Sequence, residues 1–390
     1  MKFVLFANTD WYLYNFRLST ALELAAQGHE VVMLSPPGDY GPRFAEHGLR
    51  WISLAMDRAS LNPLREAMTL RALVHALKRE RPALLHSFTM KCAVYGGLAS
   101  RLAGVPAVVN AVAGMGYVYA SDRLKARLLR PMVTALMRGT LASGHSRLIL
   151  QNPDDAKAFA RLVPEQRIRV IRSSGVDTGR FFPRDEVAPA GSAPGTRLRV
   201  VLAARLLWEK GIGEFIEAAR ILKQSGREIE CILAGMPDPG NPRSVPREQV
   251  EAWVGEGLVT WLGHVEDMPT LLRSVDVMAL PSYYREGVPK SLIEGAASGL
   301  ALVTTNLPGC REIVPEDDVD GLHVPPRDAG LLAQRLAMLD DDRALLRRLG
   351  KRARENSLAH FDERTVISRT IAVYSELLQN CPSRQALERA

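Results

Sequence analysis

The fold class of this chain is decided by residues 276–299, DVMALPSYYREGVPKSLIEGAASG. The stretch opens on an apolar run, Asp276–Leu280, which predicts a buried strand. Pro281 ends that strand and a polar loop follows. An apolar-periodic run over Val288–Ala297 then predicts a helix that stops at Gly299. Strand, loop and helix in this order are the building unit of an α/β domain.

Two carboxylates in the same stretch fit two different interpretations. Glu286 falls in the loop and Glu294 falls within the helix. Unpaired N–H groups and the positive dipole end make a helix N-terminus a natural place to hold phosphate, with carboxylates nearby. Alternatively, Ser291 and Glu294 match a capping box, in which both side chains bond to the helix backbone. The stretch by itself leaves both interpretations open.

The same alternation of strands and helices runs through the chain. The predicted fold class is therefore α/β, with two Rossmann-like doubly wound domains facing each other across a cleft (the 390-residue length also favours two domains). We expect an N-terminal domain over 1–180, a C-terminal domain over 181–360, and a helix within 361–390 that returns to the first domain. Ala188–Thr196, APAGSAPGT, is expected to be a linker or exposed loop.

The expected strands are Lys2–Ala7, Glu30–Leu34, Ala83–Phe88, Ala107–Ala111, Arg147–Gln151 and Ile168–Arg172 in the first half, and Leu198–Ala204, Glu228–Ala234, Val259–Leu262, Val275–Leu280, Ala301–Thr305 and Gly321–Val324 in the second.

Composition and cysteine usage bound the class of protein. The chain is 47% hydrophobic and 24% charged, as in a soluble globular protein. Its four cysteines are widely scattered, so neither a disulfide framework nor a zinc site is expected, and a reducing cytoplasm fits best. MKFVLFANTD at the N-terminus is too short for the apolar core of a signal peptide, and no apolar run reaches the length of a membrane span. We therefore expect a cytoplasmic protein that meets a membrane, if at all, from its surface.

Basic residues are concentrated in the first half of the chain. Residues 1–180 contain 24 Lys and Arg against 13 Asp and Glu, whereas residues 181–390 contain 26 against 30. The N-terminal half is thus expected to meet an anionic partner: acidic lipid headgroups, a pyrophosphate or nucleic acid. Nucleic acid is not favoured, because the chain has no aromatic–basic platform or recognition motif.

The segment Ser121–Arg147 concentrates this charge. It combines basic residues, Arg123, Lys125 and Arg127 among them, with apolar residues at helical spacing, and so predicts a basic amphipathic helix. One interpretation lays the helix on an anionic membrane surface. The other packs its apolar face on the sheet and leaves its long basic side chains in water. The second interpretation explains the apolar face, while the density of basic residues keeps the first open.

A further pair of cations follows the strand Leu198–Ala204. Arg205 comes directly after the strand, and Lys210 lies at the start of the next helix. Two cations beside a helix N-terminus can neutralise a diphosphate leaving group as negative charge develops on it. The pair falls in the same predicted domain, and at the same strand-end edge, as Glu286 and Glu294.

Short motifs in the second half occur in order: Arg205-x4-Lys210, Gly235 after an apolar strand, Gly263-His264-Val265 and Glu286-x7-Glu294. Together with SSGVDTGRFFP at 173–183, they resemble the retaining glycosyltransferases of family 4, and the resemblance covers nearly the whole chain. It implies the GT-B fold of two Rossmann-like domains. It also implies an enzyme that uses a nucleotide diphosphate sugar as substrate, with no metal ion and no cofactor.

The resemblance implies a role for each matching residue. Arg205 and Lys210 would bind the diphosphate of the donor. Glu286 would bind hydroxyls of the transferred sugar close to the anomeric centre, and Glu294 would bind the ribose. The remaining donor-binding positions are the backbone at Gly287, Val288, Ser291 and Leu292, the backbone of Val265 against the base, and Gly235.

The N-terminal half departs from the pattern of many family members, which have Gly-Gly after the first strand and a His after the fifth. Here Asn8–Tyr14 and Asn110–Gly116 stand at those places. In this the chain is most similar to bacterial enzymes that extend lipid-diphosphate-linked sugars for O-antigen, capsule or protein glycans. The candidate acceptor-side residues, for which ordinary core or surface roles are the alternative, are Asp10, Trp11, Tyr12, Tyr14, His86, Lys91, Tyr117, Arg123, Lys125 and Arg127.

These observations combine into one hypothesis. The chain is interpreted as a retaining glycosyltransferase on the cytoplasmic face of the inner membrane, moving a sugar from a nucleotide diphosphate sugar, UDP-linked in the first instance, to a polyprenyl-diphosphate-linked saccharide. Both a same-face and a covalent mechanism fit, because no Asp or Glu is placed as an obvious nucleophile. The alternatives are an isomerase resembling the UDP-sugar 2-epimerases and a non-catalytic protein that binds sugar nucleotides.

Overall fold

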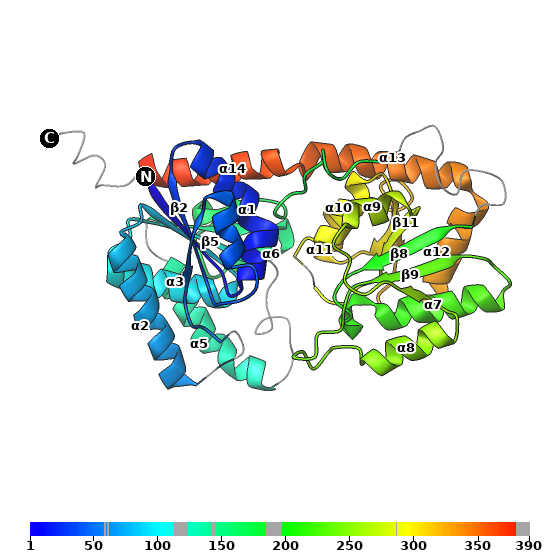
Figure 1. Ribbon diagram of the computed structural model, residues 1–390, viewed down its shortest axis with the longest axis horizontal. Helices are drawn as coiled ribbons and strands as arrows, with labels where there is room; N and C mark the ends of the chain where they lie inside the picture. The colour runs from blue at the N-terminus through cyan, green and yellow to red at the C-terminus, as the bar shows by residue number, and fades with distance from the viewer. Residues whose placement is uncertain are drawn as a thin grey trace. The chain divides into compact units, whose positions relative to one another are not determined.

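The computed structural model describes residues 1–57, 60, 62–112, 124–141, 145–184, 197–285 and 287–379, with the backbone alone at 124–129 and 132. The chain divides into two compact units. Unit 1 is Met1–Ser174 together with Thr365–Ala390, and unit 2 is Gly175–Arg364. Each unit is built on one parallel sheet with helices on both of its sides (Figure 1).

Unit 1 contains a seven-stranded sheet in the order β3-β2-β1-β4-β5-β6-β7. Its strands are β1 (Lys2–Phe6), β2 (Glu30–Ser35), β3 (Arg50–Ser53), β4 (Leu84–Phe88), β5 (Ala107–Val112), β6 (Ser146–Leu150) and β7 (Ile168–Val170). Its helices are α1 (Asp10–Ala26), α2 (Pro63–Glu80), α3 (Met90–Ala103), α5 (Leu124–Leu141), α6 (Pro153–Phe159) and α14 (Glu363–Gln379), with short 3₁₀ turns η1 (Pro42–His47) and η2 (Glu165–Arg167).

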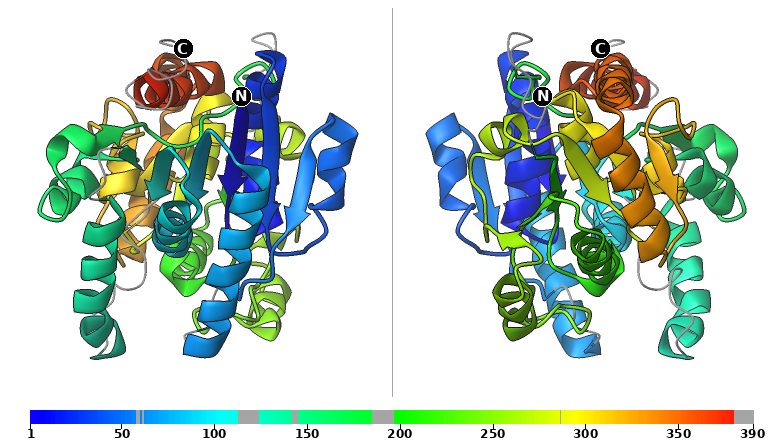
Figure 2. Two further views of the ribbon diagram at one scale, coloured as in Figure 1. Left: turned by 90° about the vertical axis from the view of Figure 1, so that its left-hand side faces the viewer. Right: turned by 90° about the vertical axis from the view of Figure 1, so that its right-hand side faces the viewer.

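The sheet of unit 1 is buried on both faces, as alternate residues of β1 show. Phe3 and Leu5 pack on one side with apolar residues of α1 and α14. Val4 and Phe6 pack on the other side with α2 and α3 (Figure 2, left). Strands buried on both faces need apolar residues at nearly every position, which explains why the sequence predicts these strands as continuous apolar runs.

Unit 2 contains a six-stranded parallel sheet in the order β10-β9-β8-β11-β12-β13. Its strands are β8 (Arg199–Ala203), β9 (Glu230–Ala234), β10 (Thr260–Trp261), β11 (Val277–Leu280), β12 (Ala301–Thr305) and β13 (Leu322–Val324). Its helices are α7 (Ile212–Gln224), α8 (Arg247–Gly255), α9 (Met268–Arg273), α10 (Lys290–Ala297), α11 (Pro308–Arg311), α12 (Ala329–Asp341) and α13 (Arg343–His360), with the 3₁₀ turn η3 (Trp208–Lys210).

In each sheet the strand order reverses at one position. In unit 1 the chain builds outward from β1 to β3 and then returns to β4, which pairs with the other side of β1. In unit 2 it builds outward from β8 to β10 and returns to β11, which pairs with β8. Ligands of open α/β sheets bind outside the carboxyl ends of the strands at such reversals. The candidate site is therefore sought after β8 and β11, and after β1 and β4.

Two expectations about elements are wrong. The strand Arg50–Ser53 is not predicted, because as an edge strand it is only partly buried and carries no apolar run. The amphipathic helix expected within Ser121–Arg147 does not reach the end of that segment: α5 ends at Leu141, and Arg147 lies in β6, as the strand expected over Arg147–Gln151 has it. The linker expected at Ala188–Thr196 lies outside the described residues.

Candidate active site

The loops that follow β8 and β11 touch each other directly. The Ser282 hydroxyl donates to the Glu209 carbonyl at 3.0 Å, and the Tyr283 N–H donates to the same oxygen at 3.1 Å. Gly211 lies at φ +80, where a side chain is strained, and an added Cβ would stand 2.3 Å from the Pro281 carbonyl oxygen. The close approach needs glycine at this position. The two sequence motifs that resemble a donor site thus share one edge of the sheet of unit 2.

Arg205 and Lys210 lie on the loop after β8. Arg205 follows the strand by two residues, its side chain is 57% exposed, and its Nη1 donates to Asp238 Oδ2 at 2.7 Å. Lys210 ends η3 and directly precedes Gly211, the N-cap of α7. An exposed guanidinium with further donors to offer can bind phosphate oxygens while keeping this carboxylate. Asp238 is a partner that sequence reasoning missed; its signal is an acid in the Pro- and Gly-rich loop after β9.

Gly235 and Val265 lie on the neighbouring strand ends. Gly235 has φ +145, and an added Cβ would stand 1.9 Å from the Ala204 carbonyl oxygen, next to Arg205. Its N–H donates to the Gly263 carbonyl at 2.7 Å. Val265 is partly buried and packs against the core of unit 2. The structure therefore brings Gly235 beside the start of the Arg205 loop, and only glycine fits there.

The start of α10 differs from the sequence expectation. The helix begins at Lys290 with Pro289 as its N-cap, so Ser291 lies inside the helix and the capping-box interpretation of Ser291 is wrong. The physical reason is Pro289, whose ring disfavours a helical conformation for the preceding Val288. The predicted helix start at Val288 is wrong for the same reason. The first N–H groups of a helix point out of its N-terminus, so this end of α10 suits a ligand oxygen.

The predicted donor residues around α10 divide into three groups. Glu286 lies outside the described residues. Val288 is 7% exposed and Leu292 is fully buried, so their side chains belong to the core and only their backbone can meet a ligand. Gly287 and Ser291 are partly buried.

Glu294 lies one turn into α10, where its side chain is 16% exposed and its Oε1 is 3.9 Å from Lys290 Nζ. Burial raises the pKa of the Glu294 carboxyl, and the positive charges of Lys290 and Arg180 act against that rise. A half-hidden carboxylate with weak internal pairing is suited to accept hydrogen bonds from ligand hydroxyls. Arg180 is not among the predicted site residues, although it belongs to SSGVDTGRFFP, one of the segments that carry the family resemblance.

The aromatic residues after β1 have internal partners in unit 1. The Tyr12 hydroxyl accepts a hydrogen bond from Arg17, and the Tyr14 hydroxyl lies 3.1 Å from His47 Nε2. Trp11 is 44% exposed, which leaves its ring accessible for stacking. Asp10 is 6% exposed and accepts from the backbone N–H groups of Trp11, Tyr40 and Gly41, each at 2.8 Å.

Two further acceptor-side candidates, His86 on β4 and Lys91 on α3, also have internal partners. Lys91 Nζ donates to the Asp57 carbonyl at 2.6 Å and to Glu66 at 3.0 Å. His86 is 1% exposed, and its Nδ1 lies 2.5 Å from the Tyr374 hydroxyl on α14. Lys91 therefore holds an internal ion pair, and His86 is buried within the sheet with one of its two ring nitrogens paired.

The remaining acceptor-side candidates lie beyond what the structure describes. Tyr117 and Arg123 are outside the described residues, and Lys125 and Arg127 belong to α5 at positions described by backbone alone.

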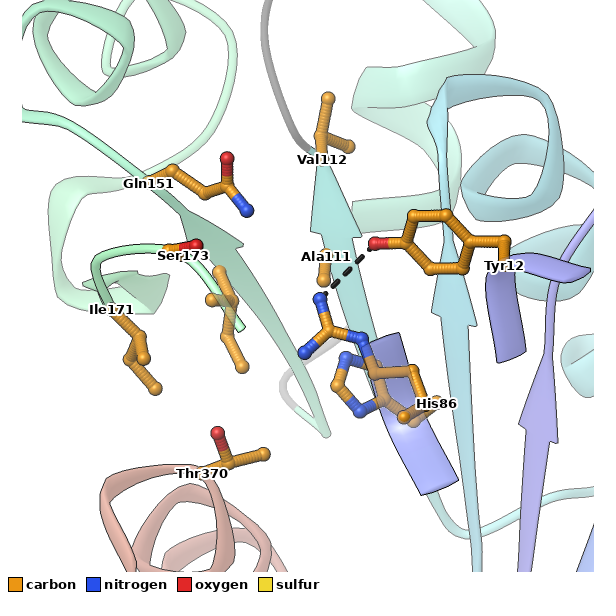
Figure 3. Close-up of a pocket in the computed structure, with 10 residues that line it drawn as sticks. Tyr12, His86, Ala111, Val112, Gln151, Ile171, Ser173 and Thr370 are labelled. Carbon is orange, nitrogen blue, oxygen red and sulfur yellow. Dashed lines mark hydrogen bonds between the residues drawn. The ribbon is translucent and has the colours of Figure 1, made fainter. Parts of the chain in front are cut away.

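A residue not predicted, Arg17, completes the group after β1. It is 6% exposed, lies on α1 and lines a pocket together with Tyr12, His86 and Gln151 (Figure 3). A signal for it exists in the sequence. Arg17 stands four residues after Leu13 and seven before Leu24, which places it on the buried stripe of the helix.

Two family profiles match the chain. The profile described as "Glycosyl transferases group 1" matches residues 183–356, and the one described as "Glycosyl transferase 4-like domain" matches residues 16–173. A Campylobacter jejuni relative, named N,N'-diacetylbacillosaminyl-diphospho-undecaprenol alpha-1,3-N-acetylgalactosaminyltransferase, is 30% identical over 94% of this chain and 96% of its own. The chain belongs to the group 1 glycosyltransferase family. It is an enzyme, and its group 1 match spans most of unit 2, the unit that carries Arg205, Lys210 and α10.

Other proteins extend the comparison of this glycosyltransferase. An Escherichia coli relative, named UDP-Gal:alpha-D-GlcNAc-diphosphoundecaprenol alpha-1,3-galactosyltransferase, is 26% identical and covers 73% of each chain. The solved structure of Anabaena HepE in complex with UDP has a TM-score of 0.78 at 18% identity, covering 96% of this chain and all of that one. WaaG, described as a glycosyltransferase of lipopolysaccharide biosynthesis, has a TM-score of 0.71 at 17% identity, covering 95% of this chain and 98% of its own.

These likenesses establish the fold of the glycosyltransferase as GT-B, with two parallel sheets in an α/β arrangement. The predicted fold class and the predicted family are confirmed. Through the part of the chain that the structure describes, no helix is both long and apolar enough to cross a membrane.

Proposed function

We propose that this glycosyltransferase moves a sugar from a UDP-sugar to a saccharide carried on a polyprenyl diphosphate, with retention at the anomeric carbon. The observation that carries the proposal is the near-full-length likeness to the Campylobacter jejuni transferase, whose name describes an acceptor linked to diphospho-undecaprenol. The Escherichia coli relative is named for the same kind of carrier and for a UDP-linked donor. Glycan synthesis on a lipid carrier is the common chemistry of both names.

The donor end of the reaction is assigned to the strand ends of unit 2. The bond between the anomeric carbon and the diphosphate oxygen breaks, and negative charge develops on the departing nucleoside diphosphate. Arg205, Lys210 and the N-terminus of α10 supply positive charge and hydrogen-bond donors on this edge. The acceptor hydroxyl oxygen forms the new bond to the anomeric carbon, and its proton passes to an oxygen of the departing nucleoside diphosphate or to the solvent. Glu286 is assigned to the sugar hydroxyls, and Glu294 to the ribose.

Metal independence is part of the proposal. Arg205 and Lys210 would stabilise the negative charge of the leaving diphosphate, as a divalent ion does in other transferases. Among the described residues there is no group of three or more His, Cys, Asp or Glu side chains arranged to hold a metal ion. We expect transfer to continue when divalent ions are chelated, because Arg205 and Lys210 would balance the charge of the leaving diphosphate.

The proposed place of work is the cytoplasmic face of the inner membrane, with the enzyme bound at the surface. A lipid-linked acceptor confines the reaction to a bilayer. The excess of basic residues in 1–180, 24 against 13, favours an anionic bilayer surface.

The test is a donor panel with a lipid acceptor. Purified enzyme is incubated with membrane lipid extract and a set of labelled nucleotide sugars, with and without excess EDTA, and the anomeric configuration of the product is read by NMR. We expect label in the lipid fraction from one UDP-sugar, in the donor's anomeric configuration, and undiminished by EDTA. Epimerised nucleotide sugar without a lipid product would support the isomerase alternative instead. A requirement for divalent ions would contradict the assigned donor site.

A further inference from the structure

The interior of unit 1 holds a guanidinium that has no carboxylate partner among the described residues. Arg17 is 6% exposed, and its Nη2 donates to the Tyr12 hydroxyl at 3.1 Å, the dashed line in Figure 3. Its Cζ lies 4.4 Å from the centre of the Phe88 ring. Its Nε is buried and has no hydrogen-bond partner among the residues that the structure describes. Within that part of the chain, the guanidinium of Arg17 contacts one hydroxyl and aromatic faces.

Such an arrangement is unfavourable for the fold by itself. A buried charge loses its hydration, and only a counter-charge or a full set of hydrogen bonds restores that loss. Cation–π contact with Phe88 offsets a part of it. Binding sites commonly keep groups that are unfavourable for stability because the ligand satisfies them. We therefore expect Arg17 to bind an anionic ligand.

His86 is a second unsatisfied polar group in the same pocket. Its Nε2 is buried and meets no partner in the described part of the chain, while Nδ1 pairs with the Tyr374 hydroxyl. Burial and the charge of Arg17 hold the pKa of His86 well below its usual range, so the ring is neutral. When the Tyr374 hydroxyl donates to Nδ1, the single ring proton sits on Nε2, and His86 becomes a donor to the pocket.

The pocket has the place and the size of a subsite for one oxygen. Val112 ends β5, Gln151 follows β6 and Ile171 follows β7, so the pocket lies at the carboxyl edge of the sheet. Arg17 and His86 come from α1 and β4, the two elements that flank the strand-order reversal of unit 1. The volume of the pocket that is open to a water-sized group is about 10 Å³, room for one such group.

We propose that this pocket binds one phosphate oxygen of the lipid-linked diphosphate of the acceptor. Arg17 supplies the positive charge and free N–H donors, and His86 donates from Nε2. The lipid and the saccharide stay outside, because the pocket admits only one oxygen. The inference deepens the proposed function and rests on it for the identity of the acceptor. It assigns to Arg17 the recognition of the diphosphate, separately from the donor diphosphate at Arg205 and Lys210.

The kinetic test compares two arginines of unit 1. Arg17→Met keeps the apolar stem of the side chain and removes its charge, and Arg17→Lys keeps the charge without the planar fork. Arg147→Met is the matched control: its guanidinium is also largely buried, at 13% exposed, but is paired with Glu376 at 2.7 Å. We expect Arg17→Met to raise the KM for the lipid-linked acceptor about 10- to 100-fold with the KM for the nucleotide sugar unchanged. Arg17→Lys should give a smaller rise.

The substitutions of Arg17 and Arg147 should have different effects on the melting temperature. Arg17→Met should melt no lower than the wild type, since it removes an uncompensated buried charge. Arg147→Met should lower the melting temperature and leave the acceptor KM unchanged, because it leaves Glu376 without that partner. A lowered melting temperature in Arg17→Met, together with an unchanged acceptor KM in Arg17→Lys, would make Arg17 a structural residue and overturn the proposal.

A binding experiment separates this proposal from the proposed function. Inorganic diphosphate and geranyl diphosphate are titrated by calorimetry into full-length enzyme saturated with UDP, which occupies the donor site. We expect both to bind wild type and to bind Arg17→Met at least about tenfold more weakly, with UDP affinity unchanged. That result would support the subsite even if no lipid-linked saccharide were glycosylated. Unchanged affinity in Arg17→Met would refute it, and binding of inorganic diphosphate alone would assign the pocket to a free anion.

Discussion

At the scale of the residue, Asp10 shows how one carboxylate holds the start of α1 against the loop that follows β2. Its oxygens accept from three backbone N–H groups, those of Trp11, Tyr40 and Gly41. Gly38 leaves the space for it, since an added Cβ would lie 2.4 Å from the Asp10 carboxylate. A carboxylate this fully used has a structural explanation beside the acceptor-side role that the sequence predicts.

Asp10→Ala separates the two roles. We expect it to lower the free energy of unfolding by about 3 kcal/mol, because it leaves buried N–H groups without an acceptor. Urea denaturation followed by circular dichroism measures the change. Asp10→Asn, which keeps a carbonyl oxygen, should lose less. Unchanged stability in Asp10→Ala with a raised acceptor KM would instead support contact with the acceptor.

Glu286 is the carboxylate for which the family resemblance predicts contact with the transferred sugar. Glu286→Gln removes the charge while preserving the size of the side chain. We expect kcat to fall by at least about 100-fold with the melting temperature unchanged, since the charge is needed in the transition state rather than in the fold. Glu316→Gln, at an exposed residue of the same unit, is the control. Normal turnover in Glu286→Gln would remove this residue from the site.

At the scale of the element, the two interpretations of the basic segment Ser121–Arg147 concern different parts of α5. Met137 and Leu141 in its second half are buried in the core of unit 1, with Val133 and Leu136 packed beside them. That half is an ordinary helix on a sheet. Of the basic residues in this segment, Arg123, Lys125 and Arg127 precede or open the helix, where the structure describes no side chains. The others, Arg130, Arg138, His145 and Arg147, are described, and Arg138 Nη2 donates to the Arg161 carbonyl at 3.3 Å.

Charge reversal tests the membrane prediction for this element. Replacing Arg123, Lys125 and Arg127 by Glu should weaken binding to anionic phosphatidylserine vesicles about 100-fold or more, at about 1 kcal/mol for each lost positive charge. Sedimentation with vesicles measures the affinity. The matched control reverses Arg347, Arg348 and Lys351, which are exposed on α13. Equal weakening by both triple variants, or by neither, would contradict a specific role for the start of α5.

At the scale of the whole molecule, the chain passes between the units twice, and unit 2 ties the two crossings together. The Val176 N–H donates to the Phe361 carbonyl at 2.9 Å, and the Glu363 N–H donates to the Val176 carbonyl at 2.9 Å. Asp362 lies between them, accepting from the Thr178 hydroxyl at 2.5 Å and from Arg364 at 3.0 Å. The Arg364 and Thr178 hydrogen bonds lower the pKa of Asp362 to about 2.

This carboxylate makes stability depend on pH. The pKa of Asp362 is lower in the folded protein than the value of about 4 that it has in the unfolded chain. Its ionised form therefore stabilises the folded state above about pH 4, and this contribution is lost as the pH falls towards 2. Asp362→Asn should therefore lower the free energy of unfolding by about 1–3 kcal/mol at pH 7. Urea denaturation between pH 2 and 7 should show the difference from wild type shrinking below about pH 4. A difference that stayed constant down to pH 2 would contradict the role of the charge.

What the sequence determined by itself is local. Apolar runs and their punctuation by Pro and Gly predict twelve of the strands because each depends on a few neighbouring residues, and the spaced motifs identify the family. Those signals fail where burial is partial, as in β3, or where one residue changes the local geometry, as Pro289 does at the start of α10.

What the tertiary structure alone decided is which side chains meet. The strand order joins Arg17 of α1 to His86 of β4 and, through α14, to Tyr374 far along the chain. It also gives Lys91 an internal partner in Glu66 and gives Arg205 one in Asp238. Whether a charged residue is paired or left for a ligand depends on neighbours brought together only when the sheet assembles, so no local pattern of residues carries that information.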